Sequence, residues 1–180
     1  MGYRQPTITE IVVKTAVTHT VTYFIMGLVA VAIFDYAHLY AETSLNLLMR
    51  PITDPMIMAG PLLQPIRGGL FGLVFYLLKE TLFGQRNGWQ VLWAMLVVIG
   101  IVGTFGPTPG SMEGMIYTVL PLRLHLIGLP EVTLQALLLS VTLCYWVNHR
   151  EKRWLNWVMG LSFIIVLLLP SLGLMVGQST

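Results

Sequence analysis

The chain has few charged residues and a single cysteine, and both shortages limit what it can be. Charged residues make up 10% of the sequence and hydrophobic residues 56%, whereas soluble domains have about 25% and roughly 45–50%. A composition this apolar predicts a protein that resides in a lipid bilayer. The lone cysteine, Cys144, excludes an intrachain disulfide and a zinc site built from cysteines.

Sequence signals of several common activities are also missing. The net charge is only +2 and one short basic group falls at 150–153, so nucleic acid is not expected as a partner. No phosphate-binding loop, dinucleotide-type glycine turn or Walker-type lysine is present, which argues against energy-coupled transport by this chain alone. Inverted halves, as in many secondary transporters, are not visible either. The first apolar run is longer than a signal-peptide core and no small-residue cleavage site follows it, so we expect it to remain as an anchor.

The chain does contain a series of long apolar runs. Runs that suit membrane-spanning helices of ~20 residues fall at about 11–34, 66–83, 89–105, 130–147 and 154–176. They predict an all-α fold, a polytopic transmembrane bundle of about five spans in which residues 1–180 form a single integral membrane domain.

Prolines and glycines interrupt the chain in two places. The segment before the second predicted span contains prolines that are expected to break any long helix, namely Pro51, Pro55, Pro61 and Pro65. The stretch 106–114 contains two prolines and three glycines, after which Ser111 is expected to cap a short helix with Glu113 in its first turn. From there to Leu129 the chain is apolar but interrupted by charge, which predicts an interfacial or re-entrant helix between spans 3 and 4.

Polar and small residues indicate which helix faces pack together. Thr15, Thr18, His19 and Thr22 recur at helical spacing, so this stripe is expected to face another helix, with His19 hydrogen-bonded to a neighbour. Extended as a straight helix, the stripe points away from the polar residues at 35–42, so we expect the two polar regions to be separate.

Glycines at regular spacing predict two further packing surfaces. Gly68 and Gly72 are four residues apart, and Gly100, Gly103 and Gly106 are three apart. Each series removes side chains from one helix face, so another helix can approach it closely.

Orientation follows from the positive-inside rule. If the 150–153 loop is cytoplasmic, seven basic residues lie inside and three outside. The inside group is Arg4, Lys14, Lys79, Arg86, Arg150, Lys152 and Arg153, and the outside group is Arg50, Arg67 and Arg123. The same choice places all five tryptophans at the inner boundary, where an aromatic belt is expected. This predicts a cytoplasmic N-terminus, an external C-terminus and a bacterial cytoplasmic (inner) membrane.

One cluster of ionisable residues follows the first apolar run. Asp35, His38 and Glu42 are three and seven residues apart, so on a helix all three lie within a narrow sector of one face. The predicted topology adds further charged residues to the same outer face, namely Asp54, Arg67, Glu113, Arg123, His125 and Glu131.

Three interpretations of this outer face remain open. The charges form only a salt-bridged rim where helices leave the bilayer. Alternatively, Arg67, Arg123, His125 and Glu131 form a ligand-binding pocket for a lipid phosphate or small anion. In the third, carboxylates and imidazole serve as acid and base or as metal ligands, the catalytic candidates being Asp35, His38, Glu42 and Glu113.

These patterns favour binding over catalysis. The Asp35 to Glu42 spacing matches neither the His-Glu-x-x-His zinc motif nor the Glu-x-x-His pairs of di-iron bundles, so no metal site or cofactor is assigned. We expect an integral membrane binding or accessory subunit whose outer-face pocket engages a lipid headgroup, a small anion or a partner membrane protein, which includes a second copy of the chain. The alternative is a membrane-embedded enzyme or metal-binding protein that uses the acidic and histidine cluster.

Overall fold

The fold is all-helical, as the composition and apolar runs predict. The computed structural model describes residues 5–34, 49–51 and 54–177, is 79% helical and has no strand within those residues. Among these described residues, three helices are long and apolar enough to cross a membrane, Ile8–Ile33, Leu122–Asn148 and Arg153–Met175.

The described helices differ widely in length. In chain order they are α1 (Ile8–Ile33), α4 (Pro55–Met58), α5 (Gly60–Leu77), α6 (Lys79–Leu82), α7 (Gly88–Val97), the π-helix η1 (Val98–Val102), α8 (Met112–Tyr117), α9 (Leu122–Ile127), α10 (Leu129–Asn148) and α11 (Arg153–Gly177).

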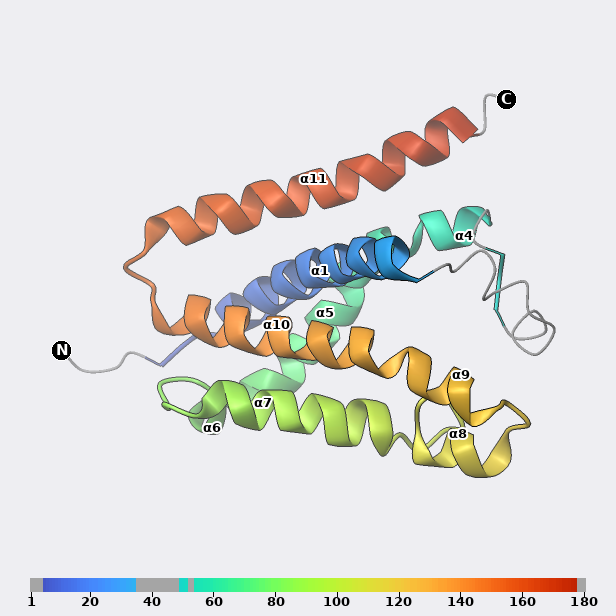
Figure 1. The fold of residues 1–180 in the computed structure, drawn as a ribbon. Helices are drawn as coiled ribbons and strands as arrows, with labels where there is room; N and C mark the ends of the chain where they lie inside the picture. Colours follow the sequence, from blue (N-terminus) through green and yellow to red (C-terminus); the bar gives the residue numbers. More distant parts are fainter. Residues whose placement is uncertain (1–4, 35–48, 52–53, 178–180) are drawn as a thin grey trace.

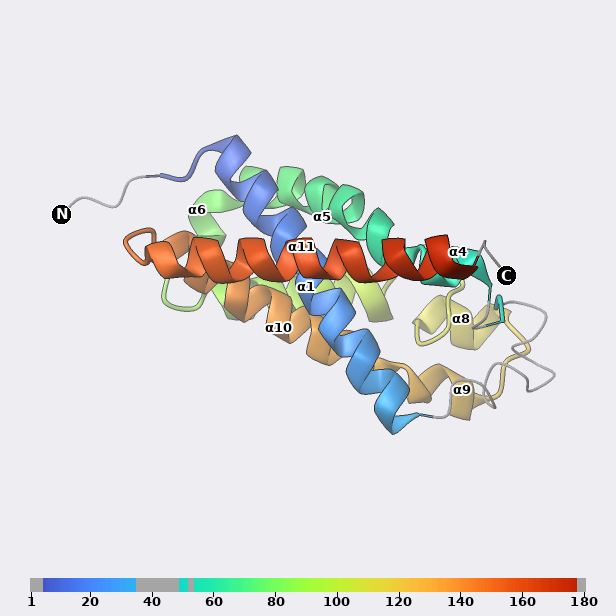
Figure 2. The same ribbon diagram turned by 90° about the horizontal axis from the view of Figure 1, so that it is seen from above.

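The long helices run back and forth between two ends of the molecule (Figure 1). α1, α7 and α11 run in one direction, and α5 and α10 run in the other. The short helices α4, α8 and α9 gather at one end, which we call the α8 end (Figures 1 and 2). α6 and the turn between α10 and α11 lie at the opposite end, which we call the α6 end.

α1 and α5 cross in close contact because α5 presents two glycines to α1. A Cβ atom at Gly68 would lie 2.7 Å from the Cα of Ala16, and one at Gly72 would lie 2.7 Å from the Cα of Val12. Both distances are shorter than real side chains allow, so only glycine permits this separation of the helices. The prediction that Gly68 and Gly72 admit a close helix is confirmed, and that helix is α1.

The polar stripe of α1 faces inward, as predicted. Thr15, Thr18, His19 and Thr22 are all at most 4% exposed. Thr7 caps the helix by accepting a hydrogen bond from the Glu10 backbone N–H at 3.3 Å.

The second predicted span begins earlier than expected. The prolines predicted a helix from about residue 66, but α5 begins at Gly60 and includes Pro61 and Pro65. Pro61 lies in the first turn, where a backbone N–H has no partner within the helix in any case. Pro65 removes one further helical hydrogen bond, and the helix continues past it to Leu77. The expected break before residue 66 was therefore wrong.

The third predicted span is interrupted by a π-helix. The pattern predicts a helix over 89–105, but α7 ends at Val97 and η1 ends at Val102. The expected glycine packing surface was also wrong, since no neighbouring atom among the described residues lies within 4 Å of a Cβ added at Gly100 or Gly106. A π-helix widens the turn and recurs at functional sites, and here Gly100 lines a cavity.

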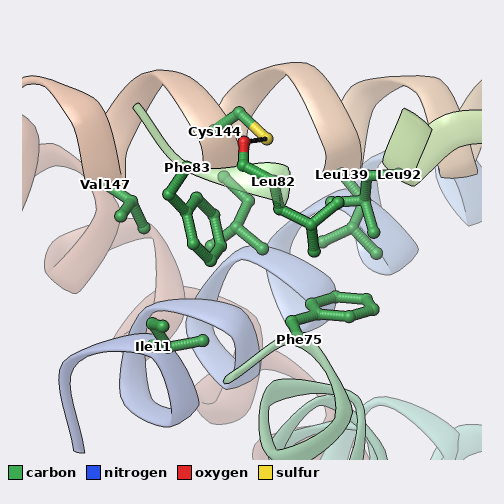
Figure 3. Packing of buried hydrophobic residues seen from close by; sticks show 9 residues of the cluster. Ile11, Phe75, Leu82, Phe83, Leu92, Leu139, Cys144 and Val147 are labelled. Carbon is green, nitrogen blue, oxygen red and sulfur yellow. Dashed lines mark hydrogen bonds between the residues drawn. The ribbon is translucent and has the colours of Figure 1, made fainter. Parts of the chain in front are cut away.

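The apolar core, whose packing Figure 3 shows, lies toward the α6 end, because it includes Phe75 near the end of α5, Leu82 of α6 and Leu92 near the start of α7. Its buried members come from α1, α5, the α6 segment, α7 and α10, and are Ile11, Phe75, Leu82, Phe83, Leu92, Leu139, Leu143, Cys144 and Val147. Cys144 directs its thiol to the Leu82 carbonyl, with a sulfur–oxygen distance of 3.8 Å. This cluster holds one end of the bundle tightly packed.

α11 packs on the outside of the bundle, chiefly against α1 (Figures 1 and 2). A smaller buried cluster of Val21, Trp146, Leu155 and Met159 joins it to α1 and α10. The Trp146 indole N–H donates to the Asn156 side-chain oxygen at 2.8 Å. Pro170 lies inside α11 without ending it, so the apolar run at 154–176 is helical past this proline.

Candidate ligand-binding site

Three of the predicted site residues, Asp35, His38 and Glu42, lie outside the described residues. The others lie on elements of the α8 end. Asp54 caps α4, Arg67 is on α5, Glu113 is in the first turn of α8, Arg123 and His125 are on α9, and Glu131 is in the first turn of α10.

Asp54 acts as a helix cap beside an exposed arginine. Its carboxylate accepts a hydrogen bond from the Met56 backbone N–H at 2.8 Å and pairs with Arg50 at 3.0 Å. The hydrogen bond from Met56 and the Arg50 guanidinium lower the pKa of the Asp54 carboxyl. This residue therefore has a local structural role.

Ser111 also serves as a cap, as predicted. Its hydroxyl oxygen accepts from the Gly114 backbone N–H at 2.9 Å, and its proton is donated to the Thr108 carbonyl at 2.8 Å. Gly114 allows this turn to close, because a Cβ there would lie 2.0 Å from the Thr108 carbonyl oxygen. The Ser111 hydroxyl thus both donates and accepts a hydrogen bond within this segment.

His125, on α9, is buried against the same loop and has a partner at each ring nitrogen. Its Nδ1 accepts from the Gly110 backbone N–H at 3.2 Å, and its Nε2 lies 3.3 Å from the Thr118 hydroxyl. A backbone N–H can only donate, so in the neutral ring the proton is on Nε2 and points to Thr118. The imidazole therefore links α9 to the loop through the Gly110 backbone.

Arg67 and Glu131, by contrast, share a cavity of about 480 Å³. Its walls come from α1, α5, α7, η1, the loop after η1 and α10. Arg123, His125 and Glu113 are not among its lining residues, and Arg123 is exposed on α9. The structure thus brings together two of the four predicted ligand-binding residues.

The cavity combines apolar walls with polar groups of both charge signs. The apolar lining includes Phe71, Leu96, Ile101 and Leu139, and the polar lining includes His19, Tyr23, Arg67, Thr104, Thr108, Glu131 and Gln135. This mixture is typical of small-molecule sites, in which a few polar groups orient a ligand inside an apolar cleft.

Arg67 offers a positive charge at the cavity. Its guanidinium carbon lies 5.4 Å from the centre of the Phe71 ring, a cation–π contact. The described residues include no carboxylate within ion-pair distance of it. Such a guanidinium suits a bidentate anion such as a phosphate or carboxylate.

His19 lies at the inner wall of the cavity and is 2% exposed. Its Nε2 is 3.1 Å from Oε1 of Gln64, and the Gln64 amide nitrogen donates to the Gly60 carbonyl at 3.1 Å. The expected hydrogen bond between His19 and a helix neighbour is confirmed. The ring also meets Phe71 edge to face, with centroids 5.1 Å apart.

The sequence separates the His19 stripe from the outer-face charges, and it gives no sign that the stripe shares a cavity with Arg67 and Glu131. One available signal was the spacing of α5, since Gln64 is four residues before Gly68 and therefore on the same face. A face that packs on α1 through Gly68 also brings Gln64 and Arg67 close to His19.

An ionic cluster at the α6 end was also missed. Glu10 pairs with Lys14 at 2.9 Å and with Arg150 of the α10–α11 turn. Lys14 additionally donates to the Trp146 carbonyl at 3.0 Å. This cluster joins the start of α1 to the end of α10, so its role is structural.

In the part of the chain that the structure describes, no three His, Cys, Asp or Glu side chains are grouped so as to hold a metal ion. The polar lining of the cavity offers hydrogen bonds and charges of both signs to a ligand. No protein-family model, curated protein or solved structure matches this chain.

Proposed function

We propose that this chain is an integral membrane protein that binds a phosphate-bearing group, of a lipid or in free form, in the cavity at the α8 end. The observation that carries the proposal is the cavity itself, with Arg67 and buried His19 among apolar walls. In this proposal the cavity is the binding site of the subunit expected from the sequence. Arg67 and Glu131 line the cavity, and Arg123 does not.

We further propose that five helical passes cross the membrane, namely α1, α5, α7 with η1, α9 with α10, and α11. Their alternating direction supports this, because it gathers the basic turns at one end (Figure 1). The tryptophans, which are typical of a membrane interface, lie at the same end. They are at the start of α7, near the end of α10 and at the start of α11. The resulting positive-inside bias favours a bacterial cytoplasmic membrane with the α8 end outside.

Sidedness is tested by labelling single cysteines in a Cys144→Ser background with a membrane-impermeant maleimide. Five passes predict that Arg86→Cys and Lys152→Cys react from the cytoplasmic side and that Glu113→Cys reacts from the other. Labelling of the first two from opposite sides would overturn the topology.

Binding is tested with two matched arginine variants of the purified full chain. Arg67→Gln should weaken retention of phospholipid in native mass spectrometry by about tenfold or more, since a hydrogen bond to a charged group contributes about 1.5–3 kcal/mol. Arg123→Gln, also exposed at the α8 end, should leave retention unchanged. If the two variants behave alike, the cavity is not the binding site.

A further inference from the structure

The helices that line the cavity pack closely on three of its sides. Among the described helices, α5 packs on α1, α1 packs on α10, and α10 packs on α7. Within the same described residues, α5 and α7 are not a closely packed pair, although both contribute to the core near the α6 end through Phe75 and Leu92. Figure 1 shows them joined through α6 at that end. The fourth side of the cavity, between α5 and η1, is the one that no helix pair closes, and we call it the α5–η1 side.

Lining residues on the α5–η1 side reach the surface of the molecule. Arg67 of α5 and Gly100 of η1 both line the cavity and are both exposed. The residues just before them are apolar and exposed as well, Ile66 at 66% and Ile99 at 60%. In the five-pass arrangement proposed above, apolar surface of this kind faces lipid hydrocarbon. The cavity therefore opens sideways, toward the acyl chains of the bilayer.

The lining changes from polar to apolar with depth. α5 and α10 run from the α8 end to the α6 end, so Phe71 lies one turn deeper than Arg67, and Leu139 lies two turns deeper than Glu131. The step from Glu131 to Leu139 covers about 12 Å at the rise of an α-helix. On α7, Leu96 is also at the deep end of the lining. Apolar side chains from three helices thus continue the cavity beyond the Arg67 guanidinium.

From this arrangement, and resting on the phosphate-binding function proposed above, we infer that the ligand is an intact phospholipid that enters through the α5–η1 side. Its phosphate binds Arg67, and one acyl chain lies among Phe71, Leu96 and Leu139. A soluble anion would leave the deep part of the cavity without a partner, because apolar cavities do not hold ordered water. A membrane lipid supplies both the charge and the hydrocarbon, and it reaches the cavity without leaving the bilayer.

Two substitutions at the lining test the acyl chain without changing the charge at Arg67. No atom of the described residues lies within 4 Å of a Cβ added at Gly100 or at Gly160 of α11. Gly100→Phe therefore adds a large side chain at the opening of the cavity, and Gly160→Phe, away from the cavity, is the matched control. Leu96→Gln is the second variant, since it keeps a side chain of similar size and places an amide in the apolar part.

The experiment compares phosphatidic acid with glycerol phosphate, which has the same phosphate and no acyl chain. The full chain is loaded with phosphatidic acid in nanodiscs and extracted, and the retained lipid is measured by native mass spectrometry with and without a large excess of glycerol phosphate. We expect the wild type to retain the lipid in both conditions. Gly100→Phe and Leu96→Gln should each lower retention about tenfold or more, in the range for overpacking or disrupting an apolar contact, and Gly160→Phe should leave it unchanged.

The outcomes distinguish this inference from the function on which it rests. Displacement of the lipid by glycerol phosphate, with binding of both lost in Arg67→Gln, would keep the phosphate site and overturn the intact phospholipid. Wild-type retention in both Gly100→Phe and Leu96→Gln, or an equal loss in Gly160→Phe, would overturn the placement of the acyl chain. Retention that does not depend on Arg67 at all would overturn the proposed function.

Discussion

The contact between α1 and α5 offers a sharp test of the packing, because two adjacent glycines of α5 differ in what surrounds them. A Cβ at Gly68 would lie 2.7 Å from the Ala16 Cα and 3.1 Å from the Thr15 carbonyl oxygen, whereas no atom of the part of the chain that the structure describes lies within 4 Å of a Cβ at Gly69. Gly→Ala inside a helix gains about 1 kcal/mol of helix propensity in either place. The difference between the two variants therefore isolates the steric cost.

We expect that steric cost to be about 1–3 kcal/mol, the range for overpacking a well-packed contact. Gly69→Ala should be stabilised by up to about 1 kcal/mol, and Gly68→Ala should be destabilised or unchanged relative to wild type. The free energy of unfolding can be measured in mixed micelles by titration with sodium dodecyl sulfate, followed by tryptophan fluorescence. If Gly68→Ala and Gly69→Ala are equally stable, the glycine contact with α1 is not present.

Gly68→Ala also has a consequence for binding. The added methyl group would lie 3.0 Å from the Cβ of His19, so α1 must move away and carry the imidazole with it. Lipid retention by this variant should fall, whereas Gly69→Ala should retain lipid as the wild type does. Loss of retention in both variants would point to an effect unrelated to this contact.

Three further substitutions test the ends of the bundle by the same unfolding titration. His125→Ala leaves the buried Gly110 N–H without its acceptor and should lower the free energy of unfolding by about 1–3 kcal/mol; an unchanged value would mean that the loop does not depend on this ring. Glu10→Gln removes the negative charge that joins α1 to the α10–α11 turn and should cost about 1–3 kcal/mol. Arg50→Gln, which breaks an exposed pair with Asp54, should change stability by less than about 1 kcal/mol, and equal effects of the two would contradict the distinction.

The parts of this fold that sequence predicts are those governed by periodicity and local chemistry. The inward stripe containing Thr15 and His19 follows from helical spacing, because polar groups avoid lipid. The cap at Ser111 follows from the residue type and the turn before it. The contact through Gly68 and Gly72 follows from the absence of side chains. In each case the cause lies within a few residues of its effect.

The parts that sequence misses depend on where two distant helices cross. Spacing shows that His19 faces a helix, but the height at which α5 crosses α1 decides that Gln64 becomes its partner. The same crossing places Arg67 beside the cavity, whereas Arg123, on α9, is not among the lining residues. The ion pair of Glu10 with Arg150 spans 140 positions and has no local signature.

The two ends of the bundle differ in packing, and this difference explains why the cavity lies where it does. At the α6 end, apolar side chains from five segments fill the interior, and the Glu10 cluster ties α1 to α10. Toward the α8 end, α7 gives way to η1, whose Gly100 contributes no side chain to the interior. Leu139 belongs both to the core and to the cavity lining, so it marks the boundary. A filled end beside an open, polar end is consistent with the preorganised binding site proposed above.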